Sequence, residues 1–88
     1  MGEVLRRAAQ LEVHEVPDGY IVYQDQKDNV CYLNKTAALV FELCDGRRDT
    51  DIIGRVAKIY DLDRSGEDQI KACIISLVKE GLVESSSR

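Results

Sequence analysis

The chain has 88 residues, of which 44% are hydrophobic and 32% are charged, and these proportions are typical of one globular domain. Its formal net charge is −4, which opposes non-specific attraction to nucleic acid or to an anionic membrane, since both need a surplus of lysine and arginine. The sequence has neither an apolar signal segment at its N-terminus nor a run approaching the roughly 20 apolar residues of a membrane span. We therefore expect a cytoplasmic protein whose partners are proteins or peptides.

The first third of the chain predicts a short arm followed by a three-stranded antiparallel meander. Residues 1–10 are expected to form an N-terminal arm or a frayed helical turn. Beyond them, β-forming residues alternate or cluster in short runs that are separated by turn residues. The three strands are expected at 11–16, 20–24 and 30–33, with turns at 17–19 and 26–29.

The apolar spacing changes from strand-like to helical after Leu33. Asn34 is a suitable N-cap for a first helix, and Asp45 and Gly46 are expected to end it. A second helix, capped by Asp49 or Thr50, extends to about residue 60. A third is expected from about Glu67 to Glu80, with Ser65 or Asp63 at its start and Gly81 at its end.

These elements predict an α+β fold, in which a three-stranded antiparallel β-meander is followed by a three-helix bundle. Such an arrangement is winged helix-turn-helix-like. The expected domain covers residues 11–84, between the arm at 1–10 and a disordered tail at 85–88.

No group of side chains in the sequence is arranged for catalysis. His14 is the sole histidine and has no metal ligand or catalytic partner at a suitable spacing, so we expect it to face solvent from a strand. The three cysteines include no C-x-x-C pair, which favours reduced, buried thiols over a disulfide or a metal site. We predict a protein without catalytic residues, metal or cofactor. The other polar residues considered, and assigned to capping or solvation, are Glu42, Asp45, Arg47, Arg48, Asp49 and Asp51.

Two features of the sequence instead suggest a binding groove. The third helix places Ile75 between Lys71 and Lys79, to one side of its expected apolar face, and this flank could accept an apolar side chain with an acidic neighbour. The strand at 30–33 is the last of the meander and carries neither charge nor proline to protect its free edge. An extended peptide could add to such an edge as a further strand.

Several short segments of the sequence together form a recognisable pattern. They are Tyr32-Leu33-Asn34, Thr36 to Val40, Cys44 to Arg48, Asp51-Ile52-Ile53 and Ala57 to Tyr60. With these segments, roughly residues 12–83 resemble the coenzyme PQQ synthesis protein D family and related precursor-peptide recognition elements. The resemblance implies a winged-helix-like, non-catalytic protein that serves ribosomally made, post-translationally modified peptides.

The resemblance implies that the leader of a precursor peptide binds as an antiparallel strand and is presented to a modifying enzyme. Its partners would be that leader and a radical SAM enzyme, cyclase or protease. The strand residues expected to pair with the leader, and the helix residues expected to line the groove, are Val30, Cys31, Tyr32, Leu33, Lys71, Ile74, Ile75, Val78 and Lys79.

The main alternative is a winged helix-turn-helix DNA-binding transcriptional regulator, whose third helix would enter the major groove. That helix offers only Lys71 and Lys79 against Glu67, Asp68 and Glu80, so it would neutralise phosphate poorly. A homodimer formed by exchange of strands or helices is compatible with either function.

Overall fold

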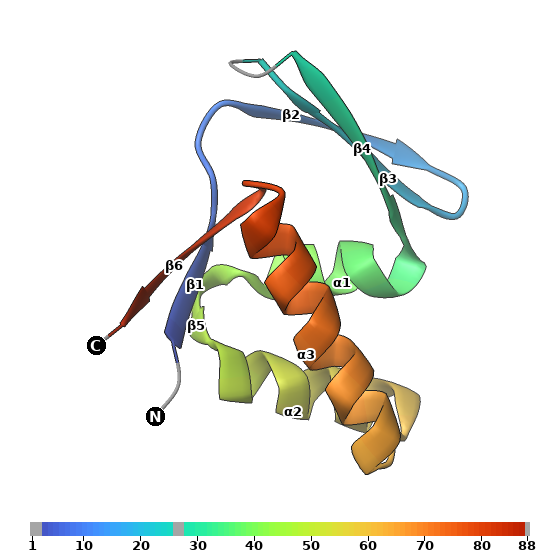
Figure 1. Ribbon diagram of the computed structural model, residues 1–88. Coiled ribbons are helices and arrows are strands. Elements are labelled where there is room, and N and C mark those ends of the chain that lie inside the picture. The colour runs from blue at the N-terminus through green and yellow to red at the C-terminus, as the bar shows by residue number, and fades with distance from the viewer. Residues whose placement is uncertain (1–2, 26–27, 88) are drawn as a thin grey trace.

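The computed structural model describes residues 3–25 and 28–87. Within these residues three helices and six strands form one compact body with two small sheets (Figure 1). The elements in chain order are β1 (Glu3–Arg7), β2 (Leu11–Val16), β3 (Gly19–Gln24), β4 (Asn29–Asn34), α1 (Lys35–Leu43), β5 (Asp45–Arg48), α2 (Asp49–Tyr60), α3 (Arg64–Lys79) and β6 (Val83–Ser87).

The predicted meander is confirmed, because β2, β3 and β4 pair antiparallel in chain order. Gly19 begins β3 where the chain passes closest to β4: it has φ +152°, and a Cβ there would lie 1.8 Å from the Leu33 carbonyl oxygen. Only glycine fits at this position. Gln26 and Lys27, in the turn predicted at 26–29, lie outside the described residues.

The second sheet was not predicted. It has the order β5-β1-β6, and its central strand is formed by the segment that we expected to be an arm. The segment expected to be a disordered tail pairs with β1 as β6, so both expectations are wrong for the described residues. The sequences EVLRR and VESSS bury mainly Leu5 and Val83, and their remaining order comes from backbone pairing between the two ends of the chain. Residues 1, 2 and 88 lie outside the described residues.

The helix starts are set by local hydrogen bonds, some of which were predicted. Asn34 is the N-cap of α1 and accepts a hydrogen bond of 2.9 Å from the Ala37 N–H, as expected. Asp63, one of the two predicted caps, accepts from Gly66 N–H, so α3 begins at Arg64 and not near Glu67. Gly66 lies within the first turn of α3, where a Cβ would meet the Leu62 side chain at 2.8 Å.

The connection between α1 and α2 differs from the expected helix stop. Residues Asp45–Arg48 form β5 and pair with β1. Gly46, with φ +105°, lies in this strand beside the Arg6 guanidinium. Arg48, and not Asp49 or Thr50, occupies the N-cap position of α2 and makes no side-chain cap. Asp49 lies in the first helical turn, where its carboxylate accepts hydrogen bonds from Thr50 N–H and from Glu3 N–H at the start of β1.

The core lies where the two sheets meet the helices. Helix α1 packs on β3 and β4, α2 packs on β1 and β5, and α3 contacts both other helices before it leads into β6. Figure 1 shows α3 running from α2 toward the meander. This path places one side of α3 near β4 and leaves its other side near the second sheet. The largest fully buried side chains are Phe41, Leu5, Ile52, Leu82, Val22, Val40, Val56, Val83 and Cys44.

Candidate functional site

The edge of β4 is free along the described residues. β4 pairs with β3 on one side, and no described strand pairs with its other side. Side chains alternate along β4: Val30 and Tyr32 are 60% and 54% exposed on the outer face, whereas Cys31 is half-buried and Leu33 is buried on the inner face. An unpaired edge of this kind presents backbone N–H and C=O groups that a further strand can satisfy.

A groove of about 440 Å³ runs beside this edge, between β4 and α3. Its floor is apolar, because Leu33, Leu77 and Leu82 are buried there. It can therefore take apolar side chains from a strand added to β4. The lining residues are Cys31, Tyr32, Leu33, Ala37, Cys73, Ser76, Leu77, Glu80 and Leu82.

One contact between the meander and α3 comes from a buried amide. Gln24, 5% exposed at the end of β3, donates a hydrogen bond of 3.0 Å from Nε2 to the backbone carbonyl of Glu80. The Asn29 side chain donates to Gln24 Oε1 at 3.5 Å, at the limit of a hydrogen bond. Gln24 therefore ties the C-terminal end of α3 to the meander.

The electrostatics of the groove suit binding and not nucleophilic chemistry. Burial raises the pKa of the Cys31 thiol, and the nearby Glu80 carboxylate raises it further. Burial also raises the pKa of Cys73. A thiol with a raised pKa is a poor nucleophile at neutral pH. The three cysteines are free thiols, and Cys44 is fully buried, with its Sγ 3.1 Å from the Val40 carbonyl oxygen.

The five predicted helix residues do not line this groove. Lys71, Ile74, Ile75, Val78 and Lys79 line a second pocket, of about 490 Å³, between α3, the start of α2 and the β1–β6 pair. At about 100° per residue, the centre of this set lies about 180° around the helix from the centre of Cys73, Ser76, Leu77 and Glu80. The structure thus separates the nine predicted residues, with the four strand residues at the β4 edge and the five helix residues in the other pocket.

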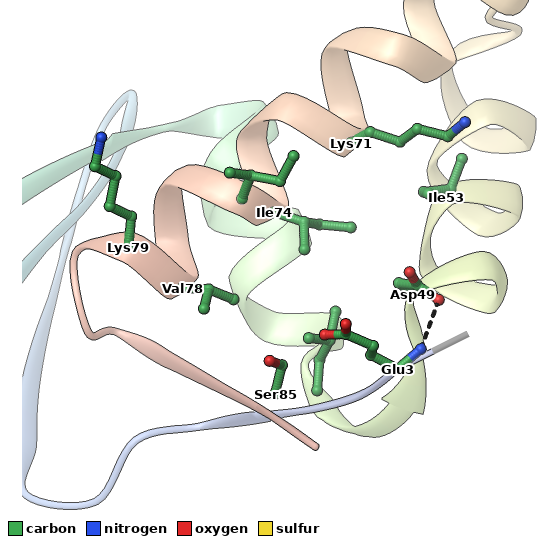
Figure 2. Close-up of a pocket in the computed structure, with 10 residues that line it drawn as sticks. Glu3, Asp49, Ile53, Lys71, Ile74, Val78, Lys79 and Ser85 are labelled. Carbon is green, nitrogen blue, oxygen red and sulfur yellow. Dashed lines mark hydrogen bonds between the residues drawn. The ribbon is translucent and has the colours of Figure 1, made fainter. Parts of the chain in front are cut away.

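The second pocket has an apolar floor between two rims. Figure 2 shows Ile74 and Val78 between Lys71 and Lys79 along α3, with Glu3 and Asp49 across the pocket. Ile75, which also lines it, is 65% exposed. Lys71 lies 3.9 Å from Asp68, an exposed pair that contributes little to stability.

The sequence of this chain matches the family described as coenzyme PQQ synthesis protein D (PqqD) over residues 19–83. The chain belongs to the PqqD family. The matched segment begins with β3 and ends at the first residue of β6, so it includes both walls of the β4–α3 groove. No curated protein has significant sequence similarity to the chain.

Two solved structures share the PqqD-family fold seen here. One is described as TbiB1 in complex with the TbiA(beta) leader peptide; it has 16% identity and a TM-score of 0.78, and the match covers 94% of this chain and 99% of that one. The other is lasso peptide synthetase B1 complexed with the leader peptide, with 26% identity, a TM-score of 0.74, and coverage of 91% and 96%.

Other polar groups of this PqqD-family chain have local roles. His14 is exposed on β2, as expected, and its Nε2 lies 2.8 Å from a carboxylate oxygen of Glu12. Asp51 pairs with Arg55, one turn later on α2, and with Arg47 in β5. Within residues 3–25 and 28–87, no group of three or more His, Cys, Asp or Glu side chains is placed to hold a metal ion, and no helix has the length and apolar character of a membrane span.

Sequence reasoning missed the α3 side of the β4–α3 groove. The signal was present, because Cys73, Leu77 and Glu80 recur at i, i+4 and i+7 and so form one row on the helix. A second signal was Gln24, a polar residue at an inward-facing strand position. The groove was instead predicted on the opposite flank of the helix, because Ile75 lies there between two lysines.

Proposed function

We propose that this protein binds the leader segment of a ribosomally made precursor peptide and presents it to a modifying enzyme. The leader adds to β4 as an antiparallel strand and places alternate side chains in the groove against α3. The observation that carries the proposal is the free β4 edge beside an apolar groove. Membership of the PqqD family supports it, as do the leader-peptide complexes of the two structural neighbours.

The energetics of such binding are adequate for a reversible adaptor. Four to six strand hydrogen bonds at about 0.5–1.5 kcal/mol each, with two buried apolar side chains at about 1.5–3 kcal/mol each, give a gross gain of about 5–15 kcal/mol. Ordering a flexible leader costs about 2–5 kcal/mol. We therefore expect about micromolar affinity, which lets the leader dissociate after modification.

The leader-binding function needs no catalytic group in this chain, and the modification belongs to the partner enzyme. That enzyme is a radical SAM protein, cyclase or protease, and both proteins act in the cytoplasm. The DNA-binding alternative receives no support from the family or the structural neighbours, and we expect no retardation of DNA in a low-salt gel-shift titration.

The modifying enzyme is proposed to dock at the second pocket. Its apolar floor and exposed Ile75 suit an aliphatic side chain. On the α3 side, opposite Glu3 and Asp49, the Lys71 and Lys79 ammonium groups suit a carboxylate beside it. The occupant is therefore an enzyme segment with an aliphatic residue next to Asp or Glu. Because this pocket and the β4–α3 groove lie on opposite sides of α3, leader and enzyme can bind at the same time.

Matched substitutions on α3 test the proposed leader site. The probe is a dodecapeptide selected from a random display library on the wild-type protein, with its affinity measured by calorimetry. Ser76→Tyr should fill the groove and weaken binding about 10- to 100-fold, which corresponds to one lost apolar anchor. Ala72→Tyr is the control, because Ala72 is exposed and lines neither the groove nor the second pocket. If both variants bind the peptide with the affinity of the wild type, the β4–α3 groove is not the peptide site.

Ile75→Asp separates the two surfaces. It should leave peptide affinity within about twofold of the wild type and abolish binding of the partner modifying enzyme, measured on the preformed peptide complex. If Ile75→Asp instead loses peptide affinity, Ile75 belongs to the leader site and the separate docking pocket is refuted.

A further inference from the structure

One ionised group faces the groove beside β4. Of its nine lining residues, Glu80 alone carries a formal charge at neutral pH. Its carboxylate is exposed, and its Oε1 lies 3.9 Å from Cys31 Sγ. No lysine or arginine among the described residues lies within ion-pair distance of it. The rest of the lining is apolar or neutral, so the groove has an apolar floor and a single anionic end.

The position of that end along β4 follows from the contacts. Cys31 and Leu33 are the inward-facing strand residues that line the groove, and they are two residues apart, about 6.8 Å. Cys31 lies at the Glu80 end. Leu33 lies toward the start of α1, where Ala37 contributes to the lining. The groove therefore changes from apolar to anionic in the direction from Leu33 to Cys31.

A guest strand that pairs antiparallel with β4 runs, from its N-terminus to its C-terminus, from the Leu33 end of the groove to the Cys31 end. Residues directly opposite in an antiparallel pair project on the same face of the sheet. A guest residue opposite Leu33 thus enters the apolar part. The guest residue two positions later lies opposite Cys31 and points toward Glu80.

We propose that the recognised leader contains an apolar residue followed, two positions later, by lysine or arginine, and that Glu80 selects the basic residue. This inference rests on the proposed leader-binding function. An apolar anchor supplies most of the affinity, while the Glu80 pair supplies specificity, because the exposed Glu80 carboxylate attracts a basic residue and repels an acidic one at that position. Burial raises the pKa of the Cys31 thiol most, and the Glu80 carboxylate at this end raises it further.

Selection from a random dodecapeptide display library tests the proposal without a known leader. Peptides enriched on the wild-type protein should carry Lys or Arg two residues after an apolar residue. A Glu80→Lys variant should enrich Asp or Glu at the same position. Glu12→Lys, on the outer face of the distant strand β2, changes the net charge equally and should enrich the same peptides as the wild type.

Affinities of individual peptides make the test quantitative. Replacing the basic residue of a selected peptide by glutamine should weaken binding to the wild type about two- to fivefold, as expected for an exposed ion pair. The same replacement should have no effect on Glu80→Gln. Peptides enriched without charge preference, or with the same preference on Glu80→Lys, overturn the role of Glu80 but leave leader binding intact. Failure to enrich any peptide whose binding is sensitive to Ser76→Tyr overturns the proposed function itself, and the Glu80 inference with it.

Discussion

Gln24 is the residue whose removal tests most directly how the β4–α3 groove is held. Its side chain is 5% exposed, and its Nε2 donates at 3.0 Å to the Glu80 carbonyl, a contact that spans 56 residues of sequence. In Gln24→Leu the shape is roughly kept but the hydrogen bond is lost. The Glu80 carbonyl then faces an apolar group in a partly buried environment.

The expected cost is about 1–3 kcal/mol of unfolding free energy, because a buried polar group left without a partner loses its solvation as well as its hydrogen bond. For a domain of this size each kcal/mol lowers the melting temperature by about 4–8 °C. We also expect weaker peptide binding, since the C-terminal end of α3 is no longer tied to β3 and the groove must be ordered when the peptide binds.

Urea unfolding followed by circular dichroism measures the stability, and calorimetry with a selected peptide measures the binding. Gln69→Leu is the matched control, because Gln69 is exposed on α3 and leucine is an equally good helix former. It should change the free energy of unfolding by less than about 0.5 kcal/mol. If Gln24→Leu unfolds at the wild-type urea concentration and binds peptide equally well, Gln24 does not set the groove and the reasoning is refuted.

Three further predictions concern the fold. Gly19→Ala should lower the free energy of unfolding in urea by well over about 1 kcal/mol, because its φ is +152° and the new Cβ would meet the Leu33 carbonyl. Gly54→Ala, in open space on α2, should raise it by about 0.5–1 kcal/mol in the same assay. Leu5→Ala should cost about 2–5 kcal/mol and speed amide exchange in β1, although the sequence suggested an arm; wild-type stability would show that the β5-β1-β6 sheet adds little. Burial raises the pKa of the Cys44 thiol from 9.0 to about 11, so the folded state holds this proton more tightly than the unfolded state. The contribution of this thiol to the free energy of unfolding is therefore complete below pH 9 and is lost as pH rises toward 11. The difference in unfolding free energy between wild type and Cys44→Ala, measured in urea, should shrink over that range. A difference that stays constant with pH would contradict this prediction.

Much of the fold was predictable because its signals are local. The alternation in 11–16, the Asn34 cap and the helical spacing from Ala37 to Cys44 each depend on residues within a few positions of one another. The free edge of β4 followed from strand order and from the lack of protecting residues. Whether residues 11–84 act alone as the functional unit stays a prediction.

Two features were decided by tertiary structure alone. The polar segments EVLRR and VESSS become strands because the two ends of the chain meet and satisfy one another's backbone groups, and no short-range pattern records that pairing. The second feature that tertiary structure decided is the rotation of α3 about its own axis. Sequence periodicity identified an apolar face, but which flank lies against β4 depends on where Gln24, β3 and the second sheet hold the helix. The sequence therefore indicated the free strand edge, whereas the helix face that lies beside it was determined only when long-range packing oriented α3.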